Sequence, residues 1–145
     1  MRTSQTITLA ALVVTSGILG ALAFGHGDVA PPARDASPVA VTRTYLDAAE
    51  WHDCDLTARL TTSHTTAWCG GLRGWAEGEP TLTGYGHVAR HAVREGPPTT
   101  SRNEECVATT IAQRGLVGPD RGTLPWEWCW VRTPDGWRLR DQGQG

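Results

Sequence analysis

The last third of the chain alternates between apolar and polar positions. Three tryptophans in it are separated by single residues and therefore share one face of an extended strand: Trp126, Trp128 and Trp130. A turn signal follows at 134–136, after which the alternation resumes over 137–141. Upstream, segment 106–112 is rich in β-branched residues and has the composition of another strand. The pattern predicts an antiparallel meander of these strands.

A cysteine in each of the first two strands suggests the register of the meander. If Cys106 lies opposite Cys129, then Thr110 faces Pro125 in an antiparallel pair, and residues 115–120 remain as a short loop. A mostly apolar set then shares the face of the tryptophans: Val107, Thr109, Ile111, Trp137 and Leu139. The other face receives both cysteines and the charged residues: Cys106, Glu127, Cys129, Arg138 and Arg140. Because one register separates the two faces so cleanly, we predict a cross-strand disulfide between Cys106 and Cys129.

Helical periodicity dominates the segment before the sheet. Ser37 and Pro38 are the residue types preferred at a helix N-cap and at the first helical position. Inward positions then recur at helical spacing: Val41, Tyr45, Ala48, Ala49 and His52. We predict a helix from Pro38 to Trp51 or His52. A shorter helix over 54–60 should follow, with Asp53 as its cap and two leucines turned inward: Leu56 and Leu60.

The middle of the chain is less regular. Residues 61–66 are poor helix formers and predict a loop, while the glycines in 72–80 weaken a helical interpretation. Residues 82–94 alternate loosely and predict one or two strands, with a turn at 95–98. Helices that precede an antiparallel sheet indicate the α+β class, with N-terminal helices packed on a curved antiparallel sheet.

The N-terminus has the pattern of a targeting segment. Arg2 precedes an uncharged apolar run over 7–24, in which Ala21 and Ala23 fit a small-x-small cleavage site. The run is also close to the length that spans a bilayer as an uncleaved anchor. A removed signal peptide and a membrane anchor therefore both stay open. Either one predicts export, with the rest of the chain outside the cytoplasm.

This pattern divides the chain into three parts. Residues 1–25 form the signal or anchor, and residues 26–36 contain little that can pack, which is typical of a linker. The folded domain is then expected over 37–145.

Export changes how the four cysteines are interpreted: Cys54, Cys69, Cys106 and Cys129. None belongs to a Cys-x-x-Cys pair, which argues against a structural zinc site. An oxidising compartment favours disulfides, and pairing Cys54 with Cys69 and Cys106 with Cys129 needs the fewest assumptions.

The net charge of −2 and the dispersed arginines give no pattern for binding nucleic acid.

Three stretches resemble the NTF2-like superfamily, also described as SnoaL-like or cystatin-like cone proteins: 41–55, 60–62 and 130–139. The most specific parts are the Asp-Cys-Asp joint at 53–55 and the Gly-Trp-Arg-Leu strand at 136–139. More closely, the chain is similar to small exported NTF2-like proteins of actinobacteria. The resemblance covers about residues 38–143. It implies a curved sheet that wraps a long helix to form a cone, and homodimers through the sheet are common in such families.

The resemblance also implies where chemistry would occur. Such a cone can hold a small apolar ligand, and its acid–base residues, where present, are Asp, His or Tyr side chains that point into it. The candidates in this chain are Tyr45, Tyr85, His87 and Asp141. The structural alternative makes Tyr45 a core residue, His87 a surface residue and Asp141 the solvated end of its strand.

The tryptophan face is a second candidate site. Three indoles can exceed what one helix covers, so Trp126, Trp128 and Trp130 could leave an aromatic patch for a ligand or a partner protein. Core filling with a partly exposed rim is the alternative interpretation.

Two further constellations carry potential chemistry. Cys69, with His64 or His87 as its base, superficially resembles a thiol nucleophile. A reactive thiol would have to stay reduced outside the cell and would leave Cys54 unpaired, so the disulfide to Cys54 is favoured. His87 and His91 stand four residues apart, which is too far to chelate a metal easily from a strand. We therefore expect no metal site.

These observations predict an exported domain, tethered to a membrane or secreted, that has no cofactor. It is expected to bind a small apolar ligand or an envelope protein. The alternative function is a SnoaL-type isomerase or cyclase that uses the cone. A cone closed by tryptophans would favour the binding module, and an open cone with a buried Asp or His would favour the enzyme.

Overall fold

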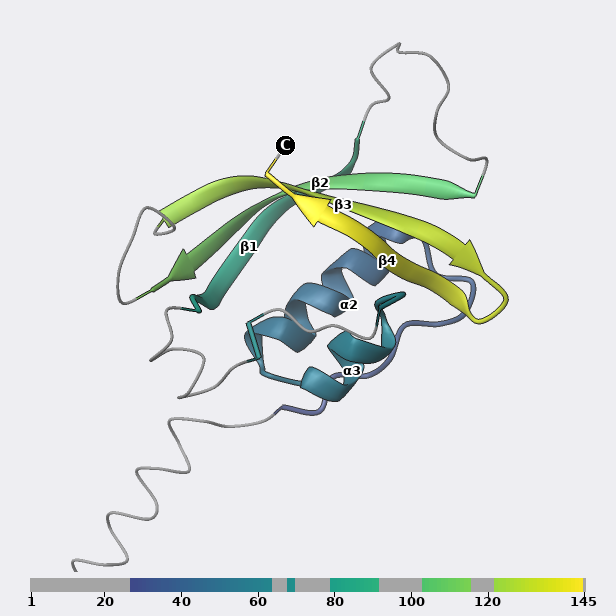
Figure 1. Ribbon diagram of the computed structural model, residues 1–145, viewed down its shortest axis with the longest axis horizontal. Coiled ribbons are helices and arrows are strands. Elements are labelled where there is room, and N and C mark those ends of the chain that lie inside the picture. Colours follow the sequence, from purple (N-terminus) through teal and green to yellow (C-terminus); the bar gives the residue numbers. More distant parts are fainter. Residues whose placement is uncertain (1–26, 64–67, 70–78, 92–102, 116–121, 145) are drawn as a thin grey trace, which may run out of the picture.

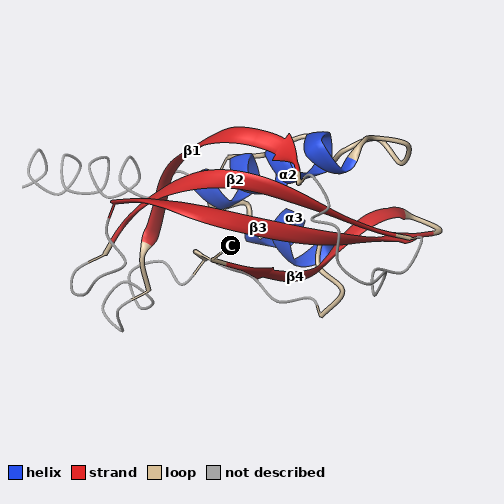
Figure 2. Ribbon diagram, turned by 90° about the horizontal axis from the view of Figure 1, so that it is seen from above, coloured by secondary structure: helices blue, strands red, loops and turns tan. Residues whose placement is uncertain are grey.

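A computed structural model describes residues 27–63, 68–69, 79–91, 103–115 and 122–144. Its elements, in chain order, are two helices and four strands: α2 (Pro38–Glu50), α3 (Cys54–Arg59), β1 (Thr81–Arg90), β2 (Glu104–Arg114), β3 (Gly122–Thr133) and β4 (Gly136–Gly143). The strands form one antiparallel sheet in the order β1-β2-β3-β4, and both helices lie on one side of it (Figures 1 and 2). The predicted α+β class and the order of helices before sheet are confirmed.

The register predicted from the cysteines is confirmed. Cys106 pairs with Cys129 and Thr110 pairs with Pro125 in the β2–β3 ladder. The second turn is tight, because Thr133 pairs with Gly136, whose φ of 110° is readily available only to glycine. Most of the predicted loop at 115–120 lies outside the described residues.

A β-bulge between Cys129 and Trp130 changes the end of β4. Trp130 pairs with Leu139, but Cys129 pairs with Asp141, so one residue of β4 is skipped in the ladder. The skipped residue is Arg140, and beyond it the side chains of β4 change faces of the sheet. Asp141 is therefore exposed on the face that carries the disulfide. The candidacy of Asp141 as an acid–base residue that points into the cone is wrong. Simple alternation would put Asp141 on the face of Leu139, but it does not allow for the extra residue.

Residues 81–90 form one strand, and it is irregular. β1 has register shifts between Leu82 and Gly84 and between Gly86 and Ala89. His87 lies in the second shift, is exposed, and has a positive φ of 50°. The predicted turn at 95–98 and nearly all of segment 72–80 lie outside the described residues.

Side chains cap both helices as their residue types predict. The Ser37 hydroxyl accepts a hydrogen bond from the Ala40 N–H at 3.2 Å, and Asp53 Oδ1 accepts one from the Leu56 N–H at 3.1 Å. The long helix ends at Glu50, slightly earlier than predicted, and His52 follows with a φ of 57°. This turn redirects the chain into α3.

The hydrophobic core lies between α2, α3 and the sheet. It contains aliphatic and aromatic side chains from both layers: Val41, Tyr45, Leu46, Ala48, Ala49, Leu56, Leu60, Trp68, Leu82, Val107, Ile111, Trp128, Trp130 and Leu139. The outer edge of β4 is partly covered, because Leu139 exchanges backbone hydrogen bonds with residues 60 and 62. The two layers therefore share one core.

The segment expected to be a linker lies against the domain from residue 27 onward. The Gly27 N–H donates to the Trp51 carbonyl oxygen at 3.0 Å, and Arg34 Nε donates to the Pro134 carbonyl oxygen at 2.6 Å. Val29 and Ala36 pack against the core. The expectation that residues 27–36 form a linker with little that can pack is wrong, because a few small side chains pack against the core and backbone groups supply hydrogen bonds. Among the described residues, no helix is long and apolar enough to cross a membrane.

Candidate functional site

Two of the three tryptophans proposed as a binding surface are interior residues. Trp128 and Trp130 are 0% exposed, and each packs on Tyr45, with ring centroids 5.5 Å and 5.9 Å away. Trp126 is partly buried, and its ring lies 6.2 Å from that of Trp128. The core-filling interpretation with a partly exposed rim therefore describes this face, and Trp126 is its rim.

The indole N–H groups differ in how they are satisfied. Trp128 Nε1 donates to Thr109 Oγ1 at 2.8 Å, and Trp68 Nε1 donates to Gln113 Oε1 at 3.1 Å. Trp126 Nε1 and Trp130 Nε1 are buried and have no acceptor among the described residues. Their Cα atoms are separated by four residues of one strand, or roughly 13 Å, so one small molecule cannot bridge both easily. Of the two, only Trp126 is near the rim.

The two tyrosines have different environments. Tyr45 is in the core, and burial raises its pKa to about 12. Tyr85 is half-buried, and its hydroxyl donates to Asp47 Oδ1 at 2.6 Å across the joint between β1 and α2. Burial, followed by this hydrogen bond and the negative charges of Asp47 and Glu50, raises the pKa of Tyr85 as well. Both hydroxyls thus stay protonated at neutral pH.

The contact between Tyr85 and Asp47 could not be predicted from the sequence pattern. Asp47 is off the apolar stripe of α2, which is typical of a solvated position, and Tyr85 is in an irregular strand. The helical wheel places Asp47 on the side of α2 away from that stripe, so helical periodicity did not predict this contact.

The candidate acid–base residues do not converge on one space. Tyr45 is core, Tyr85 is bonded to α2, His87 is exposed at the bulge of β1, and Asp141 is exposed opposite Cys129. General acid–base catalysis requires such groups within hydrogen-bond reach of a single substrate. The arrangement has no such meeting point among these residues.

All four cysteines are in disulfides. Cys54 is bonded to Cys69 and Cys106 to Cys129, as predicted. The thiol-nucleophile interpretation of Cys69 is therefore wrong, because its sulfur carries no free thiol. His64, its suggested base, lies outside the described residues. Disulfides persist in oxidising compartments, so the bonding fits a protein that matures outside the cytoplasm.

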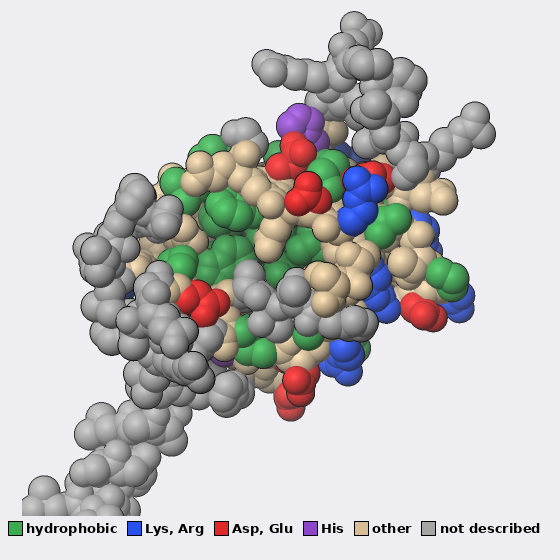
Figure 3. All heavy atoms as spheres, viewed as in Figure 1, with side chains coloured by type: hydrophobic (Ala, Val, Ile, Leu, Met, Phe, Trp, Pro, Cys, Tyr) green, Lys and Arg blue, Asp and Glu red, His purple; other side chains and the backbone are tan. Residues whose placement is uncertain are grey.

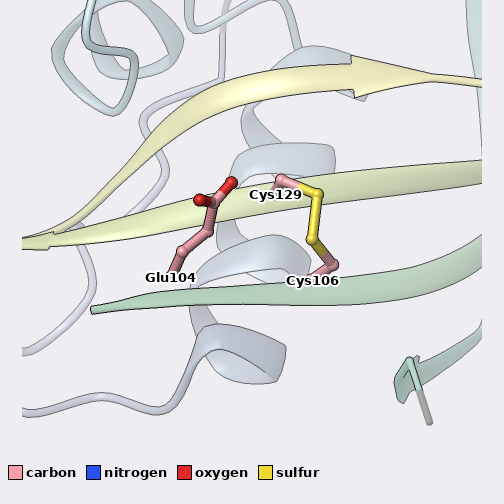
Figure 4. A group of neighbouring side chains, drawn as sticks. All are labelled: Glu104, Cys106 and Cys129. Atoms are coloured by element: carbon pink, nitrogen blue, oxygen red, sulfur yellow. A yellow bond between two sulfur atoms is a disulfide. The ribbon is translucent and has the colours of Figure 1, made fainter. Parts of the chain in front are cut away.

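A polar network surrounds the second disulfide on the outer face of the sheet. Glu104 lies beside it (Figure 4), and its carboxylate is 3.0 Å from Arg140 Nη1. On the other side, His91 Nδ1 contacts Glu127 Oε2, and Glu127 Oε1 is 3.6 Å from Cys129 Sγ. The Glu104–Arg140 pair places opposite charges in contact beside the disulfide.

Glu104, Cys106 and Cys129 bring potential ligand atoms within 4.8 Å of one another. The sulfurs are bonded to each other, so neither is a thiolate that could bind a metal (Figure 4). Arg140 already neutralises the carboxylate of Glu104. The group is an ion-pair and disulfide cluster.

An apolar area remains visible at the surface. On the side of the molecule seen in Figure 3, hydrophobic side chains gather in the middle of the domain and charged side chains lie around them. Several partly buried hydrophobic residues surround the core: Val29, Ala36, Val39, Tyr85, Val88, Leu124, Trp126 and Trp137. One large side chain is mostly in solvent, because Trp51 at the end of α2 is 59% exposed.

No protein-family model, curated protein or solved structure matches the chain. Its function must therefore be argued from these sites and from the N-terminal pattern.

Proposed function

We propose that this chain is an exported NTF2-like domain, tethered to the membrane by residues 7–24, that acts as a non-enzymatic binding module of the cell envelope. The two disulfides and the uncharged apolar run after Arg2 support export. The helices-then-sheet order and the meander support the NTF2-like part, together with the sequence resemblance over 38–143.

We favour binding over catalysis chiefly because the interior of the domain is filled by side chains. Trp128 and Trp130 each pack on Tyr45 between α2 and the sheet, which is the space that the proposed cone would offer a substrate. An isomerase or cyclase needs a carboxylate or imidazole aimed at that space, and the candidate residues point to separate places. A filled interior leaves the rim and the surfaces for recognition.

The rim suits a small apolar ligand that carries an oxygen. Trp126 offers a large apolar ring and a buried N–H without an acceptor among the described residues. A ligand oxygen there would remove the cost of an unsatisfied buried donor, about 1–3 kcal/mol. Recognition of this kind needs no catalytic group.

Export and tethering are tested by intact mass spectrometry on protein from its native host, with and without reduction and alkylation. We expect a full-length chain in the membrane fraction, with both disulfides closed. A chain that begins near Phe24 in the medium would replace the tether with secretion. Free thiols at Cys54 and Cys69 would contradict export itself.

Binding is tested by titrating the oxidised protein with anilinonaphthalene sulfonate, an apolar probe with oxygen acceptors. We expect saturable binding that Trp126→Phe weakens, because the ring is kept nearly in place while the N–H is lost. Trp51→Phe is the matched control and should leave this binding unchanged. Equal affinities for the wild type and Trp126→Phe would refute the role of the rim.

A further inference from the structure

The described chain begins where it is fastened to the corner between the two helices. The Gly27 N–H donates to the Trp51 carbonyl oxygen, and the Val29 N–H donates to Asp53 Oδ2 at 3.1 Å. Gly27 also lies close to the Trp51 side chain, since a Cβ at this position would be 3.0 Å from Trp51 Cβ. The backbone therefore leaves the domain directly beside the exposed indole.

This corner is held by several independent bonds. Asp53 caps α3 while it binds Val29, and its N–H donates to the Ala48 carbonyl oxygen at 2.8 Å. His52 Nδ1 is 3.1 Å from the Trp68 carbonyl oxygen, and the Cys54–Cys69 disulfide follows at once. The exit point of the chain is thus fixed relative to the domain.

The reach of the remaining chain is short. Between Phe24, which ends the apolar run, and Gly27 stand only Gly25 and His26. Even fully extended, this stretch spans about 11 Å. The headgroup layer on each side of the hydrocarbon core is about 5–8 Å thick. If the run is in a bilayer, Gly27 must lie within or just outside the headgroups, because the docked segment 27–36 cannot serve as a spacer.

The exposed side chain beside Gly27 is Trp51, and tryptophan is well suited to the headgroup layer. Tryptophan is enriched at membrane interfaces, where its ring packs among acyl-chain ends and its N–H meets water or headgroups. Asp28 and Asp55 are exposed near the same corner, so a zwitterionic surface suits it better than an anionic one. In Figure 1 the start of the described chain lies below the helices, with the sheet on the opposite side.

The geometry points to an interaction surface at Gly27 and Trp51 that docks on the headgroup layer of the membrane holding residues 7–24. This inference rests on the proposed tether. Trp51 then inserts among zwitterionic lipid headgroups, and the outer face of the sheet, with its disulfide and ion pairs, is directed away from the membrane.

The test uses the full chain reconstituted in phosphatidylcholine vesicles, some made with lipid brominated near the headgroup end of the acyl chains. Bromine quenches only nearby indoles, so the emission of the wild type is compared with that of Trp51→Phe. We expect the emission lost in Trp51→Phe to be blue-shifted and quenched by the brominated lipid. Trp137→Phe is the control, because Trp137 adjoins the β3–β4 turn at the other end of α2, roughly 20 Å away.

The outcomes separate the inference from the tether on which it rests. Chains that float with the vesicles and have a quenched Trp51 component support both. Chains that float but have a Trp51 component with the unquenched emission of an indole in water overturn the docking and leave the tether. Chains that do not float overturn the tether, and the docking with it.

Discussion

Trp128 and Trp130 form a matched pair in which one indole N–H is satisfied and the other is not. Both side chains are 0% exposed on β3, and both pack on Tyr45. Trp128 Nε1 donates to Thr109 Oγ1 at 2.8 Å, while Trp130 Nε1 has no acceptor among the described residues. Replacing either residue with phenylalanine removes the same atoms from the core. At Trp128 the substitution also removes a stabilising hydrogen bond, whereas at Trp130 it removes an unsatisfied N–H that destabilises the fold.

The two substitutions should therefore differ in their cost to the free energy of unfolding. The loss of ring volume costs a similar amount at both positions. Trp128→Phe also loses a net hydrogen bond worth about 0.5–1.5 kcal/mol, while Trp130→Phe removes an unsatisfied donor that costs about 1–3 kcal/mol. We expect Trp128→Phe to be less stable than Trp130→Phe by about 2 kcal/mol, taking values near the low end of these ranges.

Urea unfolding of the oxidised protein, followed by circular dichroism, measures this difference. Equal m-values for the two variants would show that the same surface is exposed in each transition. If Trp130→Phe is as destabilised as Trp128→Phe, then the Trp130 N–H has a partner, and the assignment of an unsatisfied donor is refuted.

Three further outcomes follow from the core and its joints. Removing either disulfide as a Cys→Ala pair should lower the free energy of unfolding by about 3 kcal/mol, measured in urea, since the bridges close loops of similar length, 15 and 23 residues. Burial raises the pKa of Tyr45 to about 12 in the folded protein, against 10.0 in the unfolded chain. The contribution of the protonated Tyr45 hydroxyl to the free energy of unfolding is therefore complete below pH 10 and is lost between pH 10 and 12. Alkaline titration should therefore destabilise the wild type more than Tyr45→Phe, by about 2–3 kcal/mol at the end of that window. A double-mutant cycle of Tyr85→Phe with Asp47→Ala should give a coupling of about 1 kcal/mol, and a coupling near zero would contradict the 2.6 Å hydrogen bond.

The meander could be predicted because its signals are local and agree with one another. Strict alternation places the tryptophans and Val107 on one face, and the cysteine pair fixes which residues lie opposite one another. The helix caps, Ser37 and Asp53, likewise act within a few residues of their own position. Each of these features depends on neighbours in sequence or on one strand pairing.

The features that sequence reasoning missed depend on contacts between distant segments. The bulge that moves Asp141 to the outer face changes no residue type, so the pattern alone cannot reveal it. The partner of Tyr85 is on another layer, and Trp68 reaches Gln113 across 45 residues. Such contacts are chosen by packing in three dimensions, which periodicity does not encode.

The docked segment 27–36 permits one more prediction, because it moves the start of the domain. A chain that begins at residue 37 keeps the Ser37 cap but loses the Val29 packing and the hydrogen bonds to Trp51 and Asp53. If the segment is docked in ten molecules for each one in which it is undocked, it contributes about 1.4 kcal/mol to the free energy of unfolding. A larger docked fraction contributes more. We expect residues 37–145 to be less stable than residues 27–145 by at least that amount in urea.

Val29→Ala in the longer chain is the control that isolates side-chain packing from the backbone hydrogen bonds. It should cost less than the truncation, since both the Gly27 and the Val29 N–H keep their acceptors. Equal stability of the two chain lengths would mean that 27–36 contributes nothing to the fold. The segment could then act as a spacer after all, and the short reach that brings Trp51 to the membrane surface would no longer follow.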